Sequence, residues 1–212
     1  LMEGFTLYHM PIYQKMQDMI KTGKFGDIKM IQINFGSLKE YDPQNRFFNK
    51  DLAGGALLDI GGYATAFAIS FMDEYPESIN TTVKFFETGV DEESGIILKN
   101  SKGQMAVMSL SMRAKQPKRG LVSGTKGYFE INQYPRGTEA DITYTHSAHE
   151  ESYDKVTAGD ADQALEYEVT DFQKYIEQGH DEGELEKSRM IAHILTSIRT
   201  AWGMTYPFDN EE

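Results

Sequence analysis

The 212-residue sequence contains no cysteine. A chain without cysteine can form neither a disulfide bond nor a thiolate nucleophile, and it cannot bind a metal ion through a cysteine thiolate. Proteins of reducing compartments have no need of cysteine pairs, so we expect a cytoplasmic location.

Positive charge is also scarce. The sequence has 21 lysines and arginines against 33 aspartates and glutamates, which gives a net charge of −12. Nucleic acids and anionic membranes favour a basic surface, so we expect neither as a partner. No uninterrupted apolar run approaches the ~18 residues of a membrane helix, and the N-terminal segment "LMEGFTLYHM" lacks the features of a signal peptide.

The phosphate-binding loops of nucleotide-binding domains are missing as well. Neither G-x-G-x-x-G nor G-x-x-x-x-G-K-[ST] occurs, and the stretch "GLVSGTKG" has the wrong glycine spacing for both. Such loops hold the phosphates of a dinucleotide through backbone N–H groups. We therefore expect this chain by itself to bind neither NAD nor NADP.

The apolar periodicity that is present predicts helices at both ends of the sequence and after a first strand. Helical spacing marks residues 9–22 and the two C-terminal segments, whereas residues 26–39 alternate as a strand with one wet face. A further apolar stripe predicts a helix within residues 51–71. The helical stripes consist of Ile12, Met16, Met19 and Ile20; Ile60, Ala64, Phe67 and Phe71; Leu165, Val169, Phe172 and Ile176; and Ile191, Leu195, Ile198 and Trp202.

Residues 77–156 consist of short β-rich runs separated by turns, without a linker or an internal repeat. The sequence therefore predicts one α+β domain over residues 1–212. We expect an open, mainly antiparallel β-sheet with helices packed on one face.

One strand of this sheet is apolar on both faces. In "QMAVMSLSM", Met105 and Val107 share one face, while Ala106, Met108, Leu110 and Met112 share the other. Helices can cover only one of these faces, and a large uncovered apolar face is rare on a monomer. We therefore expect a homo-oligomer, at least a dimer, formed through the open sheet face.

The segment "DLAGGALLDIGGYATAF" holds the clearest candidate site. Asp59 and Tyr63 are four residues apart, which places them on the same side of a helix. A tyrosine exchanges protons at neutral pH only with help from a nearby cation. Gly61 and Gly62 each cost a helix about 1 kcal/mol relative to alanine, so another surface must come close to them. That surface is either a ligand or a packed strand, and in the second case Tyr63 is a core aromatic.

Two other groups of residues are weaker candidates. His146 and His149 could belong to a small metal-dependent hydrolase, but a spacing of three in a strand separates their side chains and no third ligand is evident. We expect no metal site. The basic run "RAKQPKR", residues 113–119, could bind an anion, although a solvated turn is the favoured interpretation.

Four blocks carry a family resemblance along nearly the whole sequence. They read "EGFTLYHMPIYQKMQDMIKTGKFGDIKMI", "DPQNRFFNKDLAGGALLDIGGY", "SGTKGYFEI" and "GMTYPFD". Together they resemble the C-terminal domain of the Gfo/Idh/MocA oxidoreductases, in the branch that includes dimeric dihydrodiol dehydrogenase and glucose-fructose oxidoreductase. The resemblance implies the fold of a glyceraldehyde-3-phosphate dehydrogenase-like C-terminal domain.

The resemblance also implies partners for this chain. In that family an N-terminal Rossmann domain binds NAD or NADP, and an E-K-P motif there supplies a catalytic lysine. Neither lies in this sequence, so we expect the missing Rossmann domain to be a partner and this chain alone to be inactive. The implied substrate is carbohydrate-like, a sugar, polyol or diol. The alternative is a stand-alone, non-catalytic binding or scaffold module of the same fold.

Site residues follow from the same resemblance. Tyr63 would donate or accept the substrate proton with Asp59 beside it, and Gly61 and Gly62 would let the nicotinamide and substrate approach.

Two further residues, Tyr8 and Arg46, would contact the substrate. Tyr8 departs from the first block of the family, E-x-F-x-x-R, where it stands in place of the arginine.

Overall fold

The computed structural model describes residues 3–181 and 183–210, and its strands form one eight-stranded sheet in the order β2-β3-β4-β1-β5-β6-β7-β8. The strands are β1 Ile28–Gly36, β2 Ser78–Phe85, β3 Asp91–Lys99, β4 Met105–Ser111, β5 Gln116–Gly124, β6 Gly127–Asn132, β7 Glu139–Ser147 and β8 Glu150–Thr157. The strand β1 is central, and it pairs in parallel with β4, whereas the six other described pairs are antiparallel.

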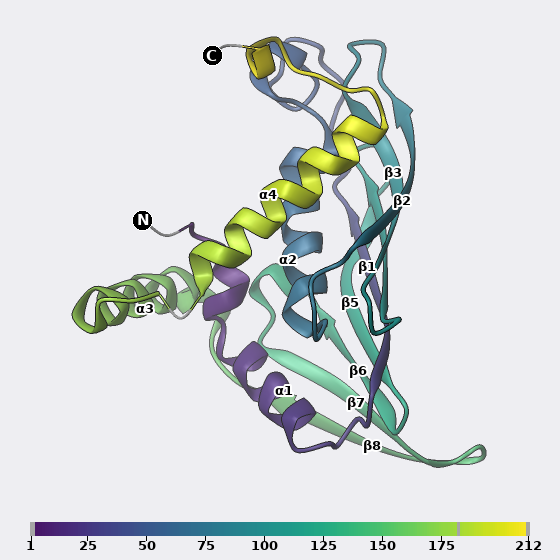
Figure 1. The fold of residues 1–212 in the computed structure, drawn as a ribbon, viewed down its shortest axis with the longest axis vertical. Coiled ribbons are helices and arrows are strands. Elements are labelled where there is room, and N and C mark those ends of the chain that lie inside the picture. The colour runs from purple at the N-terminus through teal and green to yellow at the C-terminus, as the bar shows by residue number, and fades with distance from the viewer. Residues whose placement is uncertain (1–2, 182, 211–212) are drawn as a thin grey trace.

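The helices lie on one side of this sheet, and Figure 1 shows no helix over the opposite face of the described chain. The α-helices are α1 Pro11–Lys21, α2 Gly62–Phe71, α3 Ala164–Gln178 and α4 Glu184–Ala201, and the short helical turns are η1 Thr6–His9, η2 Lys50–Leu52, η3 Leu57–Gly61, η4 Tyr134–Arg136, η5 Ala161–Gln163 and η6 Pro207–Asn210. This arrangement confirms the predicted α+β fold with an open, mainly antiparallel sheet.

The core lies between the sheet and helix α2. On β1, Ile31 and Ile33 are buried beneath the helix, as their alternation with polar residues predicts. The ring of Phe67 from α2 sits directly on β5, where a Cβ added to Gly120 would come within 2.2 Å of it. A glycine at this position is therefore what allows α2 to pack so close to the sheet.

The two faces of β4 differ as predicted. Ala106, Met108 and Leu110 are buried on the helix side, whereas Val107 remains 37 % exposed on the open side. Val107 pairs with Ile97 of β3, which is also exposed. The open face therefore carries apolar side chains on its central strands.

Helix α3 forms where the sequence predicts it, but its apolar stripe is not buried within the described chain. Four side chains of the stripe stay between 40 % and 64 % exposed: Leu165, Val169, Phe172 and Ile176. The helix instead attaches through its polar side, where Glu168 accepts a hydrogen bond from Thr6 and Asp171 lies 2.8 Å from His9. Figure 1 shows α3 projecting from the body of the fold.

The segment Lys50–Phe71 is long and apolar enough to cross a membrane by length and composition, although 72 % of its most apolar window is buried in the fold. Polar and charged residues interrupt the segment, so it does not stand out in the sequence as an unbroken apolar run. Its apolar character is accounted for by α2, whose residues pack against the sheet.

A buried carboxylate ties the start of this segment to the sheet. Asp91, the first residue of β3, is fully buried, and its Oδ2 accepts a 2.7 Å hydrogen bond from the backbone N–H of Leu57. Burial raises the pKa of Asp91 to about 6, although backbone hydrogen bonds from Leu57 and Ala56 partly oppose that rise. Asp91 thus caps the helix from a distant strand.

This pKa predicts a pH-dependent stability. Because Asp91 binds its proton more tightly in the folded than in the unfolded chain, its contribution is greatest at low pH and is lost as the pH rises through about 6. In the parent chain, the free energy of unfolding should therefore fall by on the order of 1 kcal/mol between about pH 5 and pH 7.5. Asp91→Asn should abolish this decrease, as measured by urea unfolding at each pH.

The matched control is Glu77→Gln, which removes the same charge from an exposed position. It should retain the pH slope of the parent chain. An Asp91→Asn variant with an unchanged slope would contradict the raised pKa.

Candidate active site

The helix that carries the site begins at residue 56, whereas the predicted stretch starts at residue 51. Residues 50–52 form a separate turn, and Ala53 and Gly55 then adopt positive φ angles of 57° and 116°. These left-handed residues interrupt the chain before a helix can form. The helix then opens with the π-helical turn η3, an irregularity that often marks functional sites, and continues as α2.

The loop before the helix is held by the C-terminal segment. The hydroxyl of Tyr206, from the block "GMTYPFD", donates a 2.5 Å hydrogen bond to the carbonyl of Gly54. Tyr206 is fixed in turn, because its backbone N–H and the side chain of Arg199 both bond to Asp209. The far end of the chain therefore positions the loop that leads into the site.

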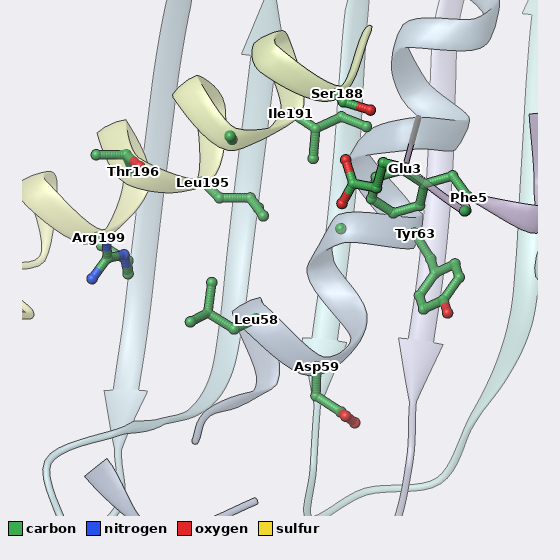
Figure 2. Close-up of a pocket in the computed structure, with 13 residues that line it drawn as sticks. Glu3, Phe5, Leu58, Asp59, Tyr63, Ser188, Ile191, Leu195, Thr196 and Arg199 are labelled. Carbon is green, nitrogen blue, oxygen red and sulfur yellow. The ribbon is translucent and has the colours of Figure 1, made fainter. Parts of the chain in front are cut away.

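A cleft of about 480 Å³ lies between this helix and α4. Asp59, Gly62 and Tyr63 line it from one side, while Ile191 and Leu195 of α4 line it from the other. Figure 2 shows Asp59 and Tyr63 leaving the same helix and pointing away from α4. The two predicted catalytic residues thus share one side of the helix, and both are among the residues that line the cleft.

The hydroxyl of Tyr63 makes no hydrogen bond to another described residue, and the side chain is half-buried. Its ring is held by edge contacts, with its centroid 5.8 Å from that of Phe5 and 6.5 Å from that of Phe35. A fixed ring with an unoccupied hydroxyl can donate or accept a proton at a bound molecule.

Asp59 is paired with the predicted substrate-binding residue Arg46. Their side chains approach to 3.4 Å, with that of Asp59 mostly buried and that of Arg46 largely exposed. Arg46 also lies over the ring of Phe47, 4.0 Å from its centroid. The pair is open to solvent on the arginine side, so its electrostatic contribution to stability is small.

The two adjacent glycines face different surroundings. A Cβ on Gly61 would lie 3.0 Å from Leu57 and 3.1 Å from Leu110 of β4, so this glycine is closed in by the sheet side. Gly62 lines the cleft, and its nearest neighbour is the Phe5 ring at 3.4 Å. The packed-strand interpretation therefore fits Gly61, whereas Gly62 lies at the cleft, where the close approach of a ligand stays a prediction.

Tyr8 does not line this cleft. Its hydroxyl is buried without a hydrogen-bond partner among the described residues, and burial followed by the charge of Glu184 raises its pKa well above the usual value. Phe5 contacts the rings of both Tyr8 and Tyr63, so Tyr8 lies behind Phe5 as seen from the cleft. Tyr8 lines a separate cavity with Glu184 and Lys187, and its predicted contact with a substrate stays a prediction.

The two weaker candidates lie in different places. His146 bonds to Ser152 within the β7–β8 hairpin, His149 is exposed at its turn, and no group of three possible metal ligands occurs among the residues described. The basic run is only partly a solvated turn, because Lys118 on β5 is half-buried over the ring of Phe35. Sequence pattern could not reveal that contact, because Phe35 lies on another strand.

The family model described as the GFO/IDH/MocA C-terminal domain matches residues 13–130, more than half of the sequence. The chain belongs to the GFO/IDH/MocA family. Its match covers β1, the site helix and the central strands, so the family includes the part of the fold that carries Asp59 and Tyr63.

Relatives within the family include trans-1,2-dihydrobenzene-1,2-diol dehydrogenases. The protein of Xenopus tropicalis is 31 % identical over 219 residues, covering 98 % of this chain and 64 % of the relative. The human protein is 28 % identical over 215 residues, with 99 % and 64 % covered. The chain therefore spans slightly less than two thirds of the length of these relatives.

Solved structures share the fold. A levoglucosan dehydrogenase in complex with NADH and levoglucosan superposes with a TM-score of 0.79 at 18 % identity, covering 92 % of this chain and 62 % of the other. A 3-ketoreductase from Actinomadura kijaniata in complex with NADP and TDP-benzene gives 0.78 at 20 % identity, covering 94 % and 62 %. At this identity the likeness establishes the fold alone.

The unequal surroundings of the glycines predict unequal effects of alanine. Gly62→Ala should leave the free energy of unfolding unchanged or raise it by up to about 1 kcal/mol, because alanine favours the helix and the added methyl meets only an ordinary contact. Gly61→Ala should be less stable than Gly62→Ala, because Leu57 and Leu110 must move. Urea unfolding of both variants tests this order, and equal stabilities would contradict a packing role for Gly61.

Proposed function

We propose that this chain is the substrate-binding and oligomerisation part of an NAD(P)-dependent oxidoreductase that acts on a sugar, polyol or diol. The dihydrodiol dehydrogenases among its relatives and the sugar-related neighbours support this substrate class. We place the protein in the cytoplasm, in keeping with its composition.

The observation that carries the proposal is the free hydroxyl of Tyr63 beside Asp59. A proton-transfer group must reach the substrate oxygen, and the Tyr63 hydroxyl, at the cleft, makes no hydrogen bond to another described residue. Asp59 stands on the same helix with Arg46, where the pair can orient a hydroxyl-bearing molecule by accepting and donating hydrogen bonds.

The cofactor is proposed to be NAD or NADP, held by a Rossmann domain that this sequence does not include. A bound nicotinamide would supply or accept the hydride. The chain's own residues fit such a neighbour, because Gly62 leaves the cleft wall without a side chain and Tyr63 projects at its end. By itself the chain offers no phosphate-binding loop, and we propose that it is inactive alone.

Replacing Tyr63 tests the proposed chemistry. In the complete, cofactor-binding protein, Tyr63→Phe should lower turnover roughly 100-fold or more, because it removes the proton-transfer group and leaves the ring in place. Cofactor affinity should hardly change. Steady-state kinetics and cofactor titration measure the two effects.

The matched control is Tyr144→Phe, which removes a hydroxyl from a half-buried tyrosine of β7 that stacks on Phe25. Turnover should survive that change. A fully active Tyr63→Phe enzyme would show that Tyr63 is a core aromatic and would overturn the proposed role.

We further propose that the open sheet face pairs with a second copy of the chain. Ile97, Val107 and Tyr128 are between 36 % and 39 % exposed there. Ile97 and Val107 lie on the adjacent strands β3 and β4, and Tyr128 lies farther along the same face on β6. Exposed apolar side chains spread over one face support a self-complementary, two-fold interface.

A charge introduced on this face should separate the copies. Val107→Lys is expected to convert the dimer into a 24.0 kDa monomer, as measured by light scattering at micromolar concentration. The control is Val169→Lys, an equivalent change on the exposed stripe of α3, which should leave the dimer intact. A parent chain that is already monomeric would contradict the proposed interface.

A further inference from the structure

A group of positive charges gathers beside Tyr63, where β1 ends and β5 begins. Lys118 places its Nζ atom 4.9 Å from the centroid of the Phe35 ring, and the same ring contacts Tyr63. Phe35 therefore has Lys118 and the proposed proton-transfer group as direct neighbours. This brings a cation from the basic run to the candidate site.

A second aromatic ring holds two more cations. Lys39 and Arg46 each lie 4.0 Å from the centroid of Phe47, and Arg46 also reaches Asp59. Ring contacts of this kind fix a long, flexible side chain in one place. Lys39 thus shares a ring with the arginine that pairs with Asp59, and Lys118 lies over a ring that contacts Tyr63.

Lys118 is surrounded by like charge. Its pKa is lowered first by partial burial and then by Lys115, Lys39 and Arg136. None of these four cations has an acidic ion-pair partner among residues 3–181 and 183–210. The protein has a net charge of −12, and yet Lys118 is repelled by three other cations with no acidic ion-pair partner for any of the four among the described residues.

We propose that Lys39, Lys115, Lys118 and Arg136, the cationic cluster, bind an anionic group of the substrate, a phosphate or a carboxylate. This rests on the proposed function and narrows it, because the substrate becomes a sugar, polyol or diol that carries such a group. An anion here would relieve the repulsion among the cations and accept hydrogen bonds from lysine and arginine side chains. Its attached carbon chain would then lie next to the Tyr63 hydroxyl.

A solvated turn explains the cluster less well. Side chains of a solvated turn extend into water, where repulsion is weak and screened, whereas Lys118 is half-buried against an aromatic ring. A polyanionic partner such as a nucleic acid is disfavoured by the excess of acidic residues in the chain as a whole.

Binding of inorganic phosphate to the 212-residue chain tests the cluster directly. Calorimetry at low, constant chloride should detect saturable binding, and Lys118→Gln should weaken it about tenfold or more, since one charge-assisted contact is lost. Arg136→Gln, an exposed position, should also weaken it and provides a second variant if Lys118→Gln unfolds. Absence of saturable binding would overturn the inference.

The matched control is Lys126→Gln, which changes the net charge equally at the opposite end of β5, in the turn to β6. Phosphate affinity should be unchanged in this variant. An equal loss in Lys126→Gln would mean that net charge alone attracts phosphate, which would overturn the assignment to the cluster.

Two further ligands distinguish the source of the anion. Glucose 6-phosphate should displace inorganic phosphate in a Lys118-dependent manner, whereas glucose should not. If adenosine 2′-monophosphate displaces it more effectively than the sugar phosphate does, the cluster serves a cofactor phosphate and the substrate assignment is wrong. These measurements need no turnover, so they remain separate from the Tyr63→Phe test of the proposed function.

Discussion

The hydrogen bond from the backbone of Leu57 to the buried carboxylate of Asp91 determines where the site helix begins. Because Asp91 opens β3, this bond fixes the helix start relative to the sheet. The contact is close enough that Gly55 can carry no side chain, since an added Cβ would lie 2.1 Å from Oδ1 of Asp91. Asp59 and Tyr63 take their positions from that start, so the geometry of the cleft depends on a residue outside it.

This arrangement removes a carboxylate from water, which costs free energy. Several contacts stabilise the carboxylate and the loop beside it. Backbone hydrogen bonds stabilise the Asp91 charge, and Tyr206 holds the preceding loop through Gly54. The Arg199–Asp209 pair secures Tyr206 in turn. Segments from the middle and the end of the sequence thus converge on one loop, which explains why the short block "GMTYPFD" belongs with the site.

The sequence predicts those features that depend on the spacing of apolar residues within one helix or strand. The stripes of α1 and α4 and the alternation of β1 follow from burial at a fixed period. Helix α2 is instead buried on nearly every side, so the single stripe predicted for it describes only part of its buried surface. Strand β8 has no apolar alternation by which the sequence could mark it as a separate run, because its side chains are mostly exposed, with Tyr153 at 75 %. The parallel pairing of β1 with β4, the π-helical turn and the half-burial of Lys118 depend on contacts between distant segments, and no period in the sequence records them.

The geometry of a helix explains how the adjacent Gly61 and Gly62 can have different roles. Successive residues of a helix point about 100° apart, so neighbours in sequence face different surfaces. Gly61 therefore turns toward Leu110 of the sheet, while Gly62 turns toward the cleft. The two interpretations of the motif, close packing and close approach of a ligand, compete only if both glycines must serve one purpose. The structure assigns packing to the first glycine and places the second, itself buried beside the Phe5 ring, among the residues that line the cleft, so the two glycines of one short segment face different neighbours.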